Sequence, residues 1–440
     1  MLTFFMTTVM INLNSQGIVL LIPLLFTFCI ALIAGYLFEK IKLPALLGYL
    51  ITGLCFSPYA LEWLQLEQSF FKNLFISHAL TNNSAILRET ALFIILYRAG
   101  LGLDREGLKA HGMNALSLSV LPCLIEAAIV TWAAHTFFNL PLIEASIIGF
   151  IIAAVSPAVI VPQMLELRKN EIGTDKKIPT LVLAGSTVDD IIAISGFGIC
   201  LSLLNPNLAD DWRLMAVKIP FSIISALVIG YYLAKPLIKI LLESRLNKIF
   251  FVPMLILIAF GFKQLEDSNL FFFSHLIAIL VLGIAIQAHD FIFSEKLSRM
   301  FAQVWYVAVV ILFVLIGAMV NPKTAMDAGY YGIIILFIGL SARSVGVYLS
   351  LIGSNLNTNE KIFCIIAYLP KATVQATVGG ITLSMFMKGK IWLHNGAETG
   401  DLIIAMAALS IIITAPLGAI GIRIFSKKLL NKPKTNSDIS

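Results

Sequence analysis

The sequence predicts an all-α polytopic membrane protein with about thirteen transmembrane helices. The chain has 440 residues, of which 59% are hydrophobic and only 13% are charged, and its mean hydropathy is +0.92. A soluble domain usually carries about 25% charged residues, so this chain lacks the polar side chains to cover a water-exposed surface. Apolar stretches of roughly 18 or more residues recur along its whole length, which favours helical spans over a barrel.

The candidate spans follow one another with short polar connections and no appended soluble domain. Their approximate limits, each correct to within several residues, are 16–38, 44–61, 86–103, 114–138, 142–166, 179–204, 216–242, 250–264, 271–289, 300–320, 329–353, 359–386 and 400–426. Residues 1–15 precede them without the basic segment of a cleaved signal peptide. Whether these residues form an extra membrane-associated helix stays open. Residues 427–440 form a short polar tail, which we expect to be disordered in the cytoplasm.

Basic residues in the connections predict the orientation of the spans. Cytoplasmic loops carry an excess of Lys and Arg, and the alternate connections that include the C-terminus hold roughly 19 of them against 8 in the other set. We therefore expect the C-terminus in the cytoplasm and the N-terminus outside, in a plasma or inner cell membrane. The net charge of +6 is explained by this topology and requires no nucleic-acid partner. Because neither a phosphate-binding loop nor a dinucleotide fingerprint is present, we expect no nucleotide and no cofactor.

Two adjacent aspartates, Asp189 and Asp190, lie within the apolar stretch "LVLAGSTVDDIIAI". A charge at the centre of a bilayer is costly, by about 2.5 to well over 10 kcal/mol. Neighbours on a helix point about 100° apart, so the two carboxyl groups cannot share one role. Asp190 lies on the face of Ser186 and Thr187, which gives that face three oxygen-bearing side chains. Asp189 faces small residues that permit close helix packing.

Three further charges are expected near span centres, and they show a symmetry. If two repeats of six spans flank a linker helix, span 4 with Glu126 corresponds to span 11 with Arg343, and span 5 corresponds to span 12, which holds Lys371. Both members of the second pair contain interior prolines, which interrupt helices. The sequence thus predicts inverted repeats with two discontinuous helices around a central site. The residues assigned to the two broken helices are Ser156, Pro157, Pro162 and Pro370.

Each buried charge has a structural and a functional interpretation. For Glu126 and Arg343 we favour an ion pair that joins two helices, because a paired charge is far less costly in lipid than a single one. Reversing both charges should then restore folding better than either single reversal. A gating or pH-sensing role is the alternative for this pair. For Lys371 we favour a role in the site, since it is about ten residues from Lys361 at the span end.

The aspartates are best explained by cation binding. Na⁺ is a hard cation that should favour oxygen ligands, by extension of the rule for hard divalent ions. Burial favours the protonated form of a carboxyl group, whereas a nearby lysine favours the ionised form. We therefore expect Lys371 to hold one aspartate ionised, while the other exchanges H⁺ for Na⁺. The alternative is that both aspartates only neutralise neighbouring lysines.

Other classes of membrane protein fit less well. An intramembrane aspartyl protease needs two carboxyl groups that converge from two helices, whereas Asp189 and Asp190 diverge on one helix. A receptor without transport has no evident need for matched broken helices. A K⁺/H⁺ antiporter or a sodium-coupled organic-anion symporter remains the principal alternative. Enzymatic activity is not expected.

Four motifs resemble the cation/proton antiporter superfamily, and within it the NHA-type sodium/proton antiporter branch. They are "YRAGLGLDREGLK", "SPAVIVP", "GSTVDDIIAISGF" and "LPKATVQATVGG", and the likeness extends over about residues 16–426. It implies a homodimer with the sodium/proton antiporter fold. Spans 1–3 and 8–10 would form a scaffold, spans 4–6 and 11–13 an ion-binding core that moves like an elevator, and span 7 a linker.

The resemblance also assigns roles to residues. Asp190 is similar to the ion- and proton-binding carboxylate and Asp189 to the neighbour that pairs with Lys371; Thr187 corresponds to a hydroxyl near the ion. Glu126 and Arg343 match a core ion pair, and Pro157 and Pro162 the broken helix of the first repeat. The implied function is exchange of cytoplasmic Na⁺ or Li⁺ for external H⁺, which serves pH homeostasis. Cation choice, stoichiometry and physiological direction do not follow from the sequence.

Overall fold

The computed structural model describes residues 15–65, 74–77, 81, 85–102, 105–204, 212–243, 250–268 and 273–431. The N-terminal segment up to residue 14 and the tail beyond residue 431 lie outside the described residues. Throughout the described part, the regular structure is helical. All thirteen expected ranges contain helix, although several of them hold more than one element.

The helices of the first half are α2 (Ser15–Lys40), α3 (Ala45–Cys55), α4 (Pro58–Trp63), α6 (Ala85–Leu101), α7 (Arg105–Phe138), α8 (Leu142–Ala153), α9 (Pro157–Lys169), α10 (Ile178–Leu203) and α11 (Trp212–Glu243). Those of the second half are α12 (Phe251–Asp267), α13 (His275–His289), α14 (Phe291–Met319), α15 (Pro322–Ser350), α16 (Thr358–Ala367), α17 (Thr373–Val378), α18 (Ile381–Met387) and α19 (Ala397–Leu429).

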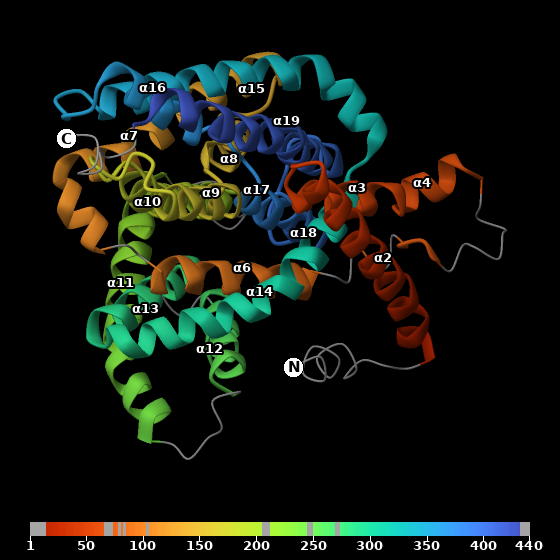
Figure 1. The fold of residues 1–440 in the computed structure, drawn as a ribbon. Helices are drawn as coiled ribbons and strands as arrows, with labels where there is room; N and C mark the ends of the chain where they lie inside the picture. Colours follow the sequence, from red (N-terminus) through yellow and green to blue (C-terminus); the bar gives the residue numbers. More distant parts are fainter. Residues whose placement is uncertain are drawn as a thin grey trace, which may run out of the picture.

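The helices pack in two groups, each drawn from both halves of the chain (Figure 1). In the first group, α14 packs against α3 and α6, and α13 packs against α6 and α11. In the second group, α7 packs against α8, α10 and α15, while α19 contacts α15, α16 and α9. Contacts between the groups are sparser and run mainly through α6, α10, α14, α17 and α19.

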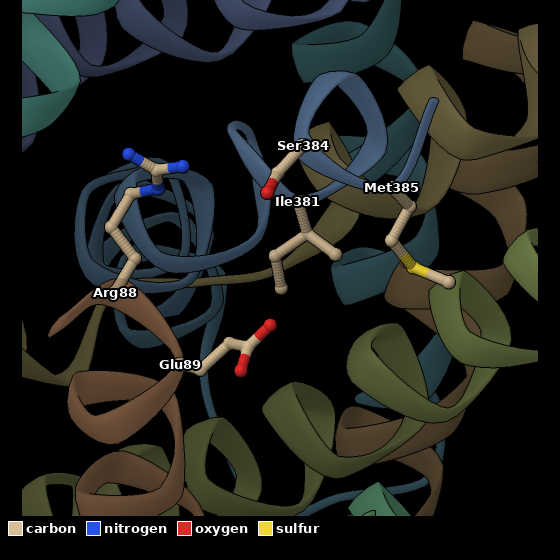
Figure 2. A pocket seen from close by; sticks show the side chains of 5 residues that line it. All are labelled: Arg88, Glu89, Ile381, Ser384 and Met385. Atoms are coloured by element: carbon tan, nitrogen blue, oxygen red, sulfur yellow. The ribbon is translucent and has the colours of Figure 1, made fainter. Parts of the chain in front are cut away.

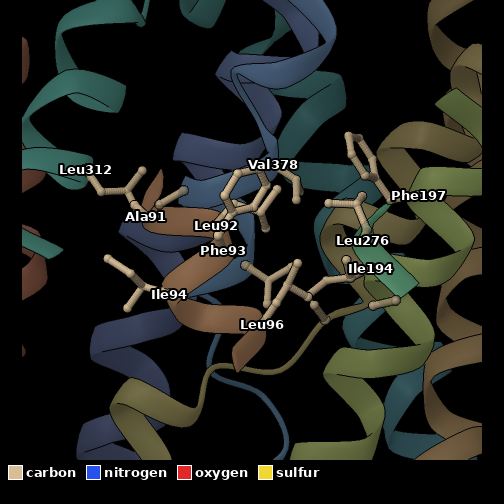
Figure 3. Packing of buried hydrophobic residues seen from close by; sticks show 14 of the residues in the cluster. Ala91, Leu92, Phe93, Ile94, Leu96, Ile194, Phe197, Leu276, Leu312 and Val378 are labelled. Atoms are coloured by element: carbon tan, nitrogen blue, oxygen red, sulfur yellow. The ribbon is translucent and has the colours of Figure 1, made fainter. Parts of the chain in front are cut away.

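The surface between the two groups is lined by apolar side chains (Figure 3). The side chains of α6 point in several directions, toward α13 and α14 of its own group and toward α10 and α17 of the second group. The labelled residues are Ala91, Leu92, Phe93, Ile94, Leu96, Ile194, Phe197, Leu276, Leu312 and Val378. Such a surface is held by non-directional contacts rather than by hydrogen bonds of fixed geometry.

Seven described helices contain stretches long and apolar enough to cross a bilayer, and they include α7, α10, α14, α15 and α19. Shorter apolar helices, such as α8 and α13, accompany them. The fold is thus that of a multi-pass helical membrane protein. The full count of thirteen spans remains a prediction.

The two spans that were expected to be discontinuous are interrupted, as their prolines predict. The first is divided between α8 and α9 by residues 154–156, and the second is divided after α16 by residues 368–372. The two breaks meet, because the backbone N–H of Ser156 donates to the carbonyl of Pro370 at 2.8 Å. Pro157 is the first residue of α9, a position where the missing N–H of proline has no consequence. Pro162 lies within α9, the second part of this broken helix, since a helix can continue past the single hydrogen bond that a proline removes.

The crossing of α3 and α14 depends on glycine on both helices. A Cβ atom at Gly317 would overlap the carbonyl oxygen of Leu50, and one at Gly53 would overlap that of Val314. Backbone atoms cannot rotate away as a side chain can, so the helices would have to separate. Small residues at such contacts are typical of membrane helix pairs.

We therefore expect Gly317→Ala to destabilise the protein by about 1–3 kcal/mol, the usual effect of overpacking. Thermal unfolding in detergent measures the loss as a lowered midpoint. Gly261→Ala on α12 is the matched control, because a Cβ atom there meets nothing within 4 Å. Equal midpoints for the two variants would show that the α3–α14 contact tolerates a methyl group.

Candidate functional site

The centre of the second helix group holds both aspartates of α10. Asp189 is fully buried and Asp190 is 5% exposed. One turn earlier, Gly185 lets α10 approach the break in the second half, since a Cβ atom there would overlap the hydroxyl oxygen of Tyr368. The expected small neighbour of Asp189 therefore does permit close packing, and the site forms where α10 passes the two breaks.

Asp189 is tied into an ion-pair network. Its Oδ1 accepts a hydrogen bond from the Arg343 guanidinium on α15 at 2.7 Å, and its Oδ2 accepts one from the backbone N–H of Val155 at 3.1 Å. Arg343 also donates to Oε2 of Glu126 on α7 at 2.6 Å. The expected contact between Glu126 and Arg343 is thus present, and it is one part of a larger arrangement.

Lys371 completes this network from the break after α16. Its ammonium donates to Oε2 of Glu126 at 2.7 Å, and its backbone N–H donates to Oγ1 of Thr414 at 2.8 Å. The side chains of Glu126, Asp189, Arg343 and Lys371 are all fully buried. When ionised, they carry two positive and two negative charges, so the network is neutral as a whole.

The expected pairing between Lys371 and Asp189 is corrected by this geometry. In the structure the salt-bridge partner of Asp189 is Arg343, and Lys371 pairs with Glu126. The physical reason lies in the guanidinium group, whose planar array of five N–H donors can serve two carboxylates at once. The ammonium of Lys371 donates to Oε2 of Glu126, the same oxygen atom that accepts from Arg343.

Asp190 is outside the network. Its Oδ1 is buried and has no hydrogen-bond partner among the described residues. The Oγ of Ser156, in the first break, is likewise buried and without a partner in the described part of the chain. Ser186 uses its hydroxyl to donate to the carbonyl of Leu183 at 3.1 Å, which leaves the lone pairs of Oγ available. The side chain of Thr187, expected on the same face, lies outside the described side chains.

The backbone groups released by the first break are taken up by side chains of other helices. Besides the bond from Val155 to Asp189, the carbonyl of Ala153 accepts a hydrogen bond from Arg343. Gln375 on α17 donates to the carbonyls of both Ile151 and Ala154, each at 2.8 Å. Sequence reasoning missed Gln375. The sequence does contain a signal for it, because Gln375 is the one amide in the run "ATVQATV", whose other side chains are apolar or carry a hydroxyl.

The described residues also enclose a small pocket that does not involve these groups. Arg88 and Glu89 of α6 and Ile381, Ser384 and Met385 of α18 line it, and the Glu89 carboxylate points into it (Figure 2). Its volume of about 10 Å³ leaves room for a water molecule at most. Glu89 forms an ion pair with Lys263 of α12. This pocket is therefore no candidate for the transport site.

Comparison with known proteins identifies the family. The family described as "Sodium/hydrogen exchanger, transmembrane" matches residues 28–428, which is almost the whole chain. The chain belongs to the sodium/hydrogen exchanger family. The resemblance inferred from the motifs is thereby confirmed, and the protein is a transporter rather than an enzyme. Sodium/hydrogen exchangers transport Na⁺ and H⁺ and need no cofactor.

Several curated exchangers are similar over most of their length. Sodium/hydrogen exchanger 9B2 of Homo sapiens is 31% identical over 441 residues, covering 95% of this chain and 76% of the relative. Sodium/hydrogen exchanger 9B1 of Homo sapiens is 30% identical over 425 residues, with coverages of 94% and 78%. Sodium/hydrogen exchanger 9B2 of Bison bison bison is 32% identical over 438 residues, with coverages of 97% and 77%.

The fold of this exchanger is also found in a solved structure. The sodium proton antiporter MjNhaP1 from Methanocaldococcus jannaschii, at pH 8, superposes with a TM-score of 0.76 at 21% identity. The superposition covers 92% of this chain and 97% of that one. The expected antiporter fold is thus confirmed, and the two inverted repeats remain a prediction.

Proposed function

We propose that this exchanger is a secondary antiporter that exchanges cytoplasmic Na⁺ or Li⁺ for external H⁺. In this proposal the cation and the proton compete for the carboxyl group of Asp190. One observation carries it: Asp190 is buried beside a neutral network in which Asp189 is fully engaged, yet its own Oδ1 has no partner among the described residues. A buried carboxyl group without a partner is stable only when it is protonated or bound to a cation.

The ligands proposed for the cation are oxygen atoms around Asp190. Besides its carboxylate, they include the hydroxyls of Ser186 and Ser156, and the sequence pattern adds that of Thr187. A hard cation favours such a set, and the buried, unpartnered Oγ of Ser156 supports its inclusion. Because Asp190 is the one carboxyl group among the five central charges that lies outside the neutral network, the arrangement favours exchange of one cation for one proton.

We further propose that the two helix groups move against each other. The core would comprise α7–α10 and α15–α19, the scaffold α2–α6 and α12–α14, and α11 would link them. The sparser contacts between the groups and the apolar side chains where α6 meets the second group support such an elevator movement, because apolar contacts have no fixed geometry. Two partly exposed ion pairs between the groups, of Lys388 with Glu89 and of Lys390 with Asp267, would have to break during it. Thirteen spans in two inverted repeats, a homodimer and a cytoplasmic C-terminus in the cell membrane complete the proposal.

Ion flux in proteoliposomes tests this function. With a pH gradient imposed and a pH-sensitive dye enclosed, added Na⁺ or Li⁺ should collapse the gradient, whereas K⁺ and choline should leave it nearly unchanged. A response to K⁺ as large as that to Na⁺ would replace the proposal with K⁺/H⁺ exchange. Na⁺ uptake that requires an organic anion would replace it with symport.

A further inference from the structure

Gln375 joins the two interrupted helices at the site. It lies on α17, directly after the second break, and its side chain is fully buried. Its Nε2 donates to the carbonyl oxygens of Ile151 and Ala154, on either side of the point where α8 ends. Both neighbours are acceptors, so the amide nitrogen and not the amide oxygen must face them.

The carbonyl of Ile151 has lost its helical partner. In an uninterrupted helix it would accept the N–H of Val155, four residues on, but that N–H donates to Asp189. A carbonyl freed in this way inside a membrane protein must find another donor, or it becomes a ligand for a bound cation, as unwound segments of transporters often provide. The Gln375 amide supplies the donor, so the carbonyl is not free to turn toward an ion.

We propose that Gln375 is a positioning residue that determines the cation's ligands by withholding the carbonyls of Ile151 and Ala154 from it. The cation is then left with the side-chain oxygens around Asp190. The bond to Ala154 also holds the peptide unit that carries the N–H of Val155, in the position from which that N–H binds Asp189. This inference rests on the proposed function, because it concerns the ligands of the exchanged ion.

Gln375→Met tests the proposal, since methionine has a similar length and no N–H donor. We expect the Na⁺ concentration for half-maximal exchange to rise about tenfold, a factor equal to ~1.4 kcal/mol, with the maximal rate within about threefold of wild type. We also expect the preference for Na⁺ over K⁺ to shrink, because two carbonyls become available as ligands. Gln163→Met on α9 is the matched control: its Nε2 bonds only within its own helix, to Val159, among the described residues.

Gln375→Glu provides a second readout, which remains informative if the methionine variant does not fold. The introduced carboxyl group can donate to one carbonyl when protonated and to neither when ionised, and it would then stand near Arg343, Asp189 and Glu126. Its Na⁺ dependence should approach wild type at low pH and deviate increasingly as the pH rises. A merely structural role predicts a deviation that does not vary with pH.

The outcomes separate this inference from the proposed function. Unchanged half-maximal Na⁺ and Na⁺/K⁺ preference in Gln375→Met, or a Gln375→Glu protein that behaves as wild type at every pH, would overturn the role of Gln375 alone. Wild-type protein that fails to exchange Na⁺ for H⁺ in the same vesicles would overturn the proposed function instead. Na⁺-dependent thermal stabilisation of each variant measures cation binding independently of flux.

Discussion

Asp190→Asn is expected to abolish Na⁺-dependent proton flux in reconstituted vesicles. Asparagine has almost the same shape as aspartate, but it carries no exchangeable proton and no negative charge for a cation. Loss of one partner of a buried charge pair costs about 2–5 kcal/mol, so cation binding alone should weaken by about thirtyfold or more. Flux measured with an enclosed pH-sensitive dye, over a range of Na⁺ concentrations, provides the measurement.

The neighbouring residue provides the control for this prediction. Asp189→Asn removes a partner of Arg343, and we expect it to lower the thermal unfolding midpoint. Asp190→Asn should leave the midpoint unchanged or raise it, because its Oδ1 gives up no hydrogen bond to any described residue. Residual Na⁺-dependent flux in Asp190→Asn, or equal destabilisation by the two variants, would contradict the division of roles between the aspartates.

Glu126→Gln is expected to destabilise the protein strongly, and a second substitution, Lys371→Met, should partly restore it. Removing one partner of a buried ion pair costs about 3–5 kcal/mol, since the other charge is left without compensation. In Glu126→Gln, Arg343 keeps Asp189, but the Lys371 ammonium loses its carboxylate. The double variant removes one charge of each sign, so the pair of Arg343 with Asp189 remains neutral.

Thermal unfolding of the two single variants and the double variant, as a double-mutant cycle, measures this coupling. We expect the double variant to unfold at a higher temperature than either single variant. Additive losses would show that Lys371 and Glu126 are energetically independent. The charge-swapped protein, Glu126→Arg with Arg343→Glu, is a further control and should not be rescued.

The expectation for the swapped protein differs from the one that the sequence alone suggests. If Glu126 and Arg343 formed an isolated pair, exchanging them would preserve it. In the network, however, the swap would bring a carboxylate against Asp189 and a guanidinium against Lys371. Two repulsive contacts between like charges would then replace two attractive ones.

The positions of the helices and of their breaks could be predicted because they depend on local properties. Runs of apolar residues define the spans, and prolines near Ser156 and at Pro370 marked the two interruptions that the structure contains. The break falls before Pro157 and not at Pro162, because a helix can begin with proline and can also survive one. Burial of all five central charges was likewise predictable, since hydropathy placed them far from the span ends.

The sequence by itself determined that the protein is a helical membrane transporter, which residues carry charge inside it, and that two adjacent aspartates on one helix must differ in role. Only the tertiary structure decided the partners. Glu126 is 245 residues from Lys371 and 217 from Arg343, and Asp189 is 154 from Arg343. Which basic side chain pairs with which carboxylate, and which amide donates to the freed carbonyls, depends on how α7, α10 and α15 cross and on where the two breaks lie between them. That geometry results from packing over the whole core, and no local pattern in the chain encodes it.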